Sequence, residues 1–188
     1  MWRALEGHQS LQPDEGISIE IEGRPIRAEN PAGELEEPKL GLDPIVIDAA
    51  NEWVYYGSIH GTGVYRVRAA DLLDRSLSKE ELAGRVERHG LKAPCDGISI
   101  DDTGNIYVTD LENNAIGVTT PDGDYRILAR DDERLIWPDG LGYGPDGYFY
   151  VTVSQLHRSA AFNAGEETSQ TPFLVMRFRP LAPSATGR

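Results

Sequence analysis

The sequence has little cysteine, little basic charge and no long apolar run, and each shortage excludes a class of protein. Its 188 residues contain a single cysteine, Cys95, so no disulfide can form within the chain. No apolar run approaches the roughly 20 residues that a membrane-spanning helix requires, so we expect no membrane partner. Asp and Glu number 31 against 18 Lys and Arg, which leaves a net charge of −13. This balance disfavours nucleic acid as a partner, because phosphates attract basic surfaces, and is compatible with cationic ligands or metal ions.

The composition is nevertheless that of a folded domain. Hydrophobic residues make up 39% of the chain and charged residues 26%, which supplies enough apolar surface for a core. The first eight residues lack the apolar stretch of a signal peptide. The sequence therefore predicts either an intracellular protein or a chain whose natural start lies further upstream.

A pattern of short strands recurs three times from residue 41 onward. Each copy opens with an aspartate and a short apolar run, at Asp43, Asp96 and Asp139, and continues through a turn into further strand-like runs. The leading aspartates follow one another at intervals of 53 and 43 residues. Repeats of this length, with Gly or Asn in the turns, are typical of β-propeller blades. The sequence predicts an all-β fold with three blades, at about residues 41–90, 91–134 and 135–188.

The longer first interval contains an insertion with helical periodicity, between residues 69 and 86. Ser78 and Glu81 have the spacing of a capping box, in which each side chain bonds the other residue's backbone. We expect one short surface helix between two blades.

Residues 1–40 differ in composition, being polar and rich in Pro, Gly and Glu. Ile17, Ile19 and Ile21 alternate with polar residues before a Gly-containing turn, which predicts a hairpin followed by a loop, a candidate part of a fourth blade. Propellers close with about four to eight blades, so we expect a partial propeller of about three to four blades. Its edge strands would lack partners, which favours self-association or pairing with a missing N-terminal half.

Two segments resemble a known family. Residues 96–101 with 105–117, and residues 137–140 with 144–147 and 151–158, are similar to the bacterial branch of the major royal jelly/yellow family. The resemblance implies the C-terminal half of a six-bladed propeller related in fold to the gluconolactonase/regucalcin lactonases. It also implies an extracellular or periplasmic location, since family members are mostly secreted.

The three leading aspartates are the candidate metal ligands. Asp43, Asp96 and Asp139 stand just before the innermost strands, which rim the central channel of a propeller, and carboxylates that converge there can bind Ca²⁺. Asp139 best matches the channel ligands of the lactonases that the fold resembles, and Asp96 is next. Asp43 matches less well, because Pro44 follows it where the others have glycine. The alternative is that each aspartate caps its own turn.

Three further residues are candidates for a site. His157 follows a predicted strand and is a candidate general base for opening a lactone, since histidine titrates near neutrality; the alternative is a structural loop residue. Trp137 precedes an Asp-Gly turn and is a candidate ligand-binding residue at a pocket border. Asn114, within the family-like segment, is a second candidate for ligand binding.

These observations leave three functions open. The first is a small-molecule-binding propeller without catalysis, as is inferred for the royal jelly/yellow proteins. The second is a Ca²⁺-dependent hydrolase that resembles the lactonases, in which the ion polarises the lactone carbonyl. The third is an incomplete gene product that needs a partner half.

Overall fold

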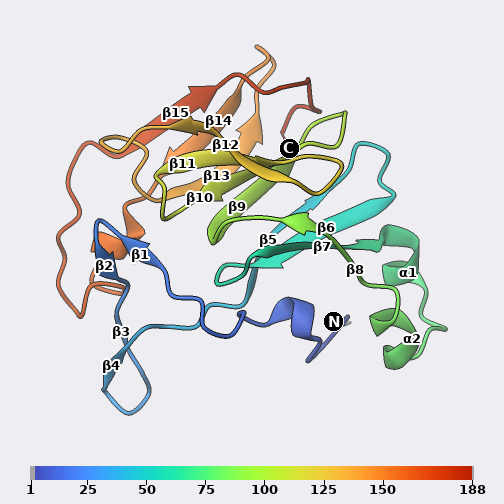
Figure 1. Ribbon diagram of the computed structural model, residues 1–188, viewed down its shortest axis with the longest axis horizontal. Coiled ribbons are helices and arrows are strands. Elements are labelled where there is room, and N and C mark those ends of the chain that lie inside the picture. Colours follow the sequence, from blue (N-terminus) through green and yellow to red (C-terminus); the bar gives the residue numbers. More distant parts are fainter. Residues whose placement is uncertain (1–2, 188) are drawn as a thin grey trace.

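Three antiparallel sheets stand side by side as the blades of an open fan, and the N-terminal residues run along one side of it (Figure 1). The structure is a computed structural model that describes residues 3–187. The prediction about a signal peptide rests in part on Met1 and Trp2, which lie outside the described residues. The all-β partial propeller expected from the repeats is confirmed.

The blades are built from eleven strands in sequence order. The first blade consists of β5 to β8, at Leu42–Ile47, Trp53–Ser58, Gly63–Arg68 and Glu87–Leu91. The second consists of β9 to β12, at Cys95–Ile100, Ile106–Asp110, Ala115–Thr119 and Tyr125–Arg130. The third contains β13 to β15, at Pro138–Tyr143, Phe149–Val153 and Leu174–Phe178. The innermost strands β5, β9 and β13 are neighbours, so their first residues meet at one face of the fan.

The insertion forms two helices rather than one, and both lie within the first blade, between β7 and β8. Helix α1 spans Ala69–Leu73 and α2 spans Lys79–Ala83. The Asp74 side chain accepts a hydrogen bond from the Ser76 backbone at 2.9 Å, a turn that ends the first helix. The expected capping box then starts the second: Ser78 Oγ accepts from Glu81 N at 3.1 Å, and the Glu81 carboxylate accepts from Ser78 N at 2.8 Å. No helix within residues 3–187 is long and apolar enough to cross a membrane.

The core lies in layers between the blades. Successive side chains of a strand point to opposite faces of its sheet, and the apolar ones pack against the adjacent blade. One buried cluster joins the first and second blades and includes Tyr55, Val64 and Ile98. Another joins the second and third and includes Tyr107, Ile116 and Phe149. Burying one such side chain contributes about 1.5–3 kcal/mol, so these layers dominate the stability of the fan.

The N-terminal residues form no blade. A 3-10 helix at Gln9–Leu11 precedes two separate two-stranded sheets, which pair β1 with β2 and β3 with β4, at Glu20–Ile21, Arg24–Pro25, Ala28–Glu29 and Leu35–Glu36. The predicted hairpin is therefore present, but it adds no strand to the three described blades. Its turn uses Glu22 and Gly23, both with positive φ.

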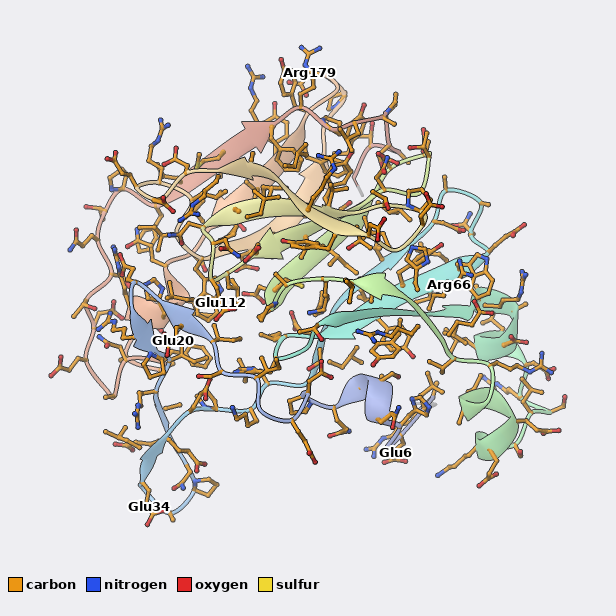
Figure 2. All side chains as sticks on the ribbon, in the orientation of Figure 1. Glu6, Glu20, Glu34, Arg66, Glu112 and Arg179 are labelled. Carbon is orange, nitrogen blue, oxygen red and sulfur yellow. The ribbon has the colours of Figure 1, made fainter. Side chains whose placement is uncertain are left out.

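Residues 17–40, here called the strap, lie across the loops of all three blades. Ile19, Ile21 and Ile26 are buried in a cluster with one loop residue from each blade, namely Ile59, Leu111 and Trp137. Glu20 N donates to Glu112 in the second blade at 3.2 Å, and the two side chains lie close together in Figure 2. The strap thus connects the three blades at the face where their inner strands begin.

Candidate functional site: the acidic face

The three leading aspartates occupy equivalent places in the sheets. In each blade the pairing between the inner strand and the next strand slips by one residue at the aspartate and the residue after it, which is a β-bulge. The bulge re-aims the side chains at the start of the inner strand. Asp43, Asp96 and Asp139 are therefore presented in the same way at one face of the fan.

A close approach of backbones brings the second and third blades together there. A Cβ atom at Gly97 would lie 2.3 Å from the Asp139 carbonyl oxygen, so only glycine fits beside Asp96. The freed backbone groups are held by threonines: Gly97 N donates to Thr109 Oγ1 at 2.7 Å, and Gly140 N donates to Thr152 Oγ1 at 3.1 Å. In both blades the threonine follows the glycine by twelve residues.

The first blade has a different arrangement at this position, which accounts for the proline that follows Asp43 where the other blades have glycine. Pro44 has no N–H to be held, and Gly57 stands where the other blades have threonine. The space beside Gly57 is filled by the buried side chain of Lys92, whose Cε lies 2.6 Å from the position of a glycine Cβ. Lys92 Nζ donates to the carbonyl oxygens of Ser58 at 2.6 Å and Gly61 at 2.7 Å, which ties the linker before the second blade to the first.

The carboxylates interact electrostatically. Burial, the charges of Asp139 and Asp43 and a hydrogen-bonding contact with Asp43 together raise the pKa of Asp96 from 3.8 to about 7, against the opposing effect of the hydrogen bond from Trp137. Burial and the charge of Asp43 also raise the pKa of Asp139, against a hydrogen bond from Ser154. The three side chains therefore lie near enough for their charges to affect one another, and their assignment as metal ligands stays a prediction.

Trp137 is placed beside Asp96 but is not open to a ligand. Its Nε1 donates to Asp96 Oδ2 at 2.6 Å, and its ring is fully buried. The ring stacks against His157, with centroids 5.9 Å apart, and against Phe162, with centroids 5.8 Å apart. Trp137 therefore holds one oxygen of Asp96 in place. Its buried ring does not border a pocket.

His157 is buried and held by the strap. Its Nε2 lies 2.9 Å from Glu22 Oε2, and only 2% of its side chain is exposed. Hydrogen bonding to Arg158 lowers the pKa of Glu22 to about 2, so the carboxylate is an acceptor and His157 Nε2 carries the donated proton. Burial lowers the pKa of His157. Within residues 3–187 no hydrogen bond joins His157 to the three leading aspartates. His157 is connected to Asp96 only indirectly, because its ring stacks on Trp137, which donates to Asp96.

Asn114 lies in the turn after β10, at the same end of the second blade as Asp96. Its backbone is left-handed, with φ of 46°, and its carbonyl accepts from Asp131 N at 3.0 Å. Its Oδ1 is buried and has no hydrogen-bond partner in the described chain. Within residues 3–187 no hydrogen bond joins Asn114 to the three leading aspartates, and its assignment as a ligand-binding residue stays a prediction.

Glu22 is the residue that sequence reasoning missed. It stands in a polar hairpin and reaches His157 and Arg158 more than 130 residues later. The paired glycine and threonine spacings could have linked the second and third blades, but nothing local in the sequence marks Glu22.

A calcium ion would need more ligands than this face offers. Within residues 3–187 no group of three or more His, Cys, Asp or Glu side chains is arranged to hold a metal ion. One Asp96 oxygen is also engaged by Trp137. The described residues therefore do not form a complete Ca²⁺ site.

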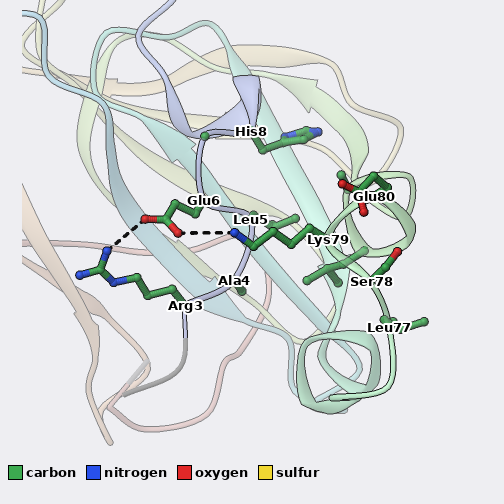
Figure 3. A pocket seen from close by; sticks show the side chains of 12 residues that line it. Arg3, Ala4, Leu5, Glu6, His8, Leu77, Ser78, Lys79 and Glu80 are labelled. Atoms are coloured by element: carbon green, nitrogen blue, oxygen red, sulfur yellow. Dashed lines mark hydrogen bonds and ion pairs between the residues drawn. The ribbon is translucent and has the colours of Figure 1, made fainter.

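A separate cavity of about 360 Å³ lies between the N-terminal residues 3–8 and residues 77–83, which include α2 (Figure 3). Glu6 joins its two walls, accepting from Arg3 at 3.0 Å and facing Lys79 at 3.9 Å. None of the six predicted site residues lines it.

The chain belongs to the major royal jelly protein family, whose family model matches residues 29–179. Solved structures with the same fold include a gluconolactonase from Xanthomonas campestris, 16% identical with a TM-score of 0.52, where the match covers 92% of this chain and 58% of that one. A luciferin-regenerating enzyme is 13% identical with a TM-score of 0.55, covering 95% and 57%. A putative gluconolactonase is 13% identical with a TM-score of 0.50, covering 96% and 55%.

These similarities establish the β-propeller fold and nothing finer, because the identities are low. The chain spans less than two thirds of the length of these structures. No curated protein matches the chain.

Proposed function

We propose that this chain is a ligand-binding propeller module that takes a small organic cation at the acidic face. The observation that carries the proposal is the shared placement of Asp43, Asp96 and Asp139 at bulges on neighbouring inner strands, near enough for the charge of Asp43 to raise the pKa of the other two. Like charges held together are costly, and a bound cation would relieve that cost. The net charge of −13 further favours the approach of cations.

The role of the surrounding residues follows from this assignment. Trp137 fixes one oxygen of Asp96, and Gly97 lets the third blade approach closely enough to add Asp139. In this assignment His157 has a positioning role through its stack on Trp137. The ligand would meet preformed carboxylates on rigid strands, which reduces the entropy cost of binding.

Calorimetric titration with spermidine, a small cation with several ammonium groups, tests the proposal. We expect one binding site per chain, and we expect Asp139→Asn to weaken binding by roughly tenfold, since it removes one partner of a charge-assisted contact. Asp122→Asn is the matched control, because it removes the same charge from an exposed turn. An equal loss of spermidine affinity in both variants would show that only the net charge attracts spermidine and would refute the site.

Ca²⁺-dependent lactone hydrolysis is a second candidate. It is favoured by the contact between Asp43 and Asp96, which places carboxylate oxygens side by side, and by the fold shared with a gluconolactonase. The described residues supply too few ligands for the ion, so this function requires groups from another chain or segment. A Ca²⁺ titration with Asp139→Ala alongside, followed by a lactone hydrolysis assay, tests it. Absence of Ca²⁺ binding by the wild-type chain would remove this candidate.

A further inference from the structure

A second cavity lies where the strap meets the long loop between β14 and β15. Its volume is about 230 Å³, and its walls are Arg24, Pro25, Ile26, Arg27, His157, Phe162, Asn163 and Ala164. The two walls are joined by backbone hydrogen bonds, from Arg27 N to Phe162 O at 3.0 Å and from Ala164 N to Arg27 O at 3.3 Å. These bonds hold the cavity open in one shape.

The charge of this cavity is opposite to that of the chain. Two arginines line it and no Asp or Glu does so among the described residues, although the chain as a whole carries −13. Arg24 is oriented by a hydrogen bond to Asn163 Oδ1 at 3.0 Å. The Arg27 side chain has no hydrogen bond or ion pair within residues 3–187. Guanidinium groups in this arrangement match a carboxylate in geometry and charge.

His157, which also lines the cavity, carries an unsatisfied acceptor. His157 donates through Nε2 to Glu22, so its neutral ring has a bare lone pair at Nδ1. That atom is buried and lacks a hydrogen-bond partner in the described chain. A buried polar atom left without a partner is costly, and a ligand hydroxyl would satisfy it. Phe162 and Ile26 add apolar surface for a short carbon chain.

We propose that this cavity is a binding site for a small hydroxylated carboxylic acid, with the carboxylate between Arg24 and Arg27 and a hydroxyl donating to His157 Nδ1. The site is distinct from the acidic face, because its ligand is an anion and its walls come from the strap and the β14–β15 loop. It joins those two segments, so its ligand would also strengthen the hold of the strap on the third blade.

Calorimetric titration with malate tests the proposal, with succinate as the ligand that lacks only the hydroxyl. We expect malate to bind one site per chain, and we expect succinate to bind roughly tenfold more weakly, since it leaves His157 Nδ1 unsatisfied. Arg27→Gln should weaken malate binding by roughly tenfold or more. Arg126→Gln is the matched control: that arginine is also exposed and outside the cavity, and it should bind malate like the wild type.

The possible results divide clearly. Weaker malate binding by Arg27→Gln but not by Arg126→Gln, with an unchanged circular dichroism spectrum, supports the site. Absence of malate binding at millimolar concentration, or equal affinity in Arg27→Gln and the wild type, overturns it. Equal binding of malate and succinate overturns the role given to His157. Spermidine binding at the acidic face is unaffected by Arg27→Gln in every case, so the two proposals fail independently.

Discussion

The raised pKa of Asp96 predicts an unusual dependence of stability on pH. Its pKa rises from 3.8 to about 7 on folding, so the folded chain binds a proton that the unfolded chain releases. The stability gained from protonated Asp96 is complete below about pH 4 and is lost as the pH rises through 7. With 1.36 kcal/mol per pKa unit, the whole contribution is at most about 4 kcal/mol, of which about 2–3 kcal/mol disappears between pH 5 and pH 8.

Asp96→Asn isolates this contribution. Asparagine resembles protonated aspartate, and its Oδ1 can still accept from Trp137 Nε1. Urea unfolding followed by tryptophan fluorescence should therefore give similar free energies of unfolding for both proteins below about pH 4. Between pH 5 and pH 8 the stability advantage of the variant should grow by about 2–3 kcal/mol. Histidines with lowered pKa values act in the opposite direction but equally in both proteins, so the difference removes them. A difference independent of pH would refute the convergence of carboxylates.

Three further predictions concern the blades and the strap. Gly97→Ala should lower the free energy of unfolding by about 1–3 kcal/mol, because the new Cβ would overlap the Asp139 carbonyl, whereas Gly142→Ala, with no described atom within 4 Å, should change it little; thermal unfolding compares the two. Glu22→Gln should destabilise the chain by about 1 kcal/mol at neutral pH, after allowance for solvent screening, and the effect should fade as the pH falls from 4.5 toward 2, where wild-type Glu22 is itself protonated. The chain should self-associate through the third blade, where Val175 is 69% exposed, and Val175→Lys should shift light scattering toward the monomer; a monomeric wild type contradicts this prediction.

The blades could be predicted from the sequence because their signals are local. Alternating apolar residues and Gly-containing turns specify each strand pair over a few residues, and the Ser78–Glu81 spacing specifies the start of α2. The family resemblance and the partial propeller, which also depend on local sequence patterns, are both confirmed. The aspartates could be grouped because each occupies the same place in its repeat.

The rest depends on contacts between distant residues. Trp137 was expected at a pocket border, but the strap covers its side of the fan and buries its ring. His157 was considered as a base, but Glu22 engages its Nε2. No periodicity links a turn residue of a polar hairpin to a loop in the last blade, so neither outcome could be predicted from local pattern.

The strap has a consequence for the order of events during synthesis. The strap is synthesised well before some of its partners: Arg158, which binds Glu22, follows Glu22 by 136 residues. At about 5–20 residues per second, a ribosome needs roughly 7–27 s to cover that distance. Until Trp137 is made, Ile19, Ile21 and Ile26 lack the third-blade residue of the cluster that buries them, so the emerging chain exposes an apolar segment that is prone to aggregate.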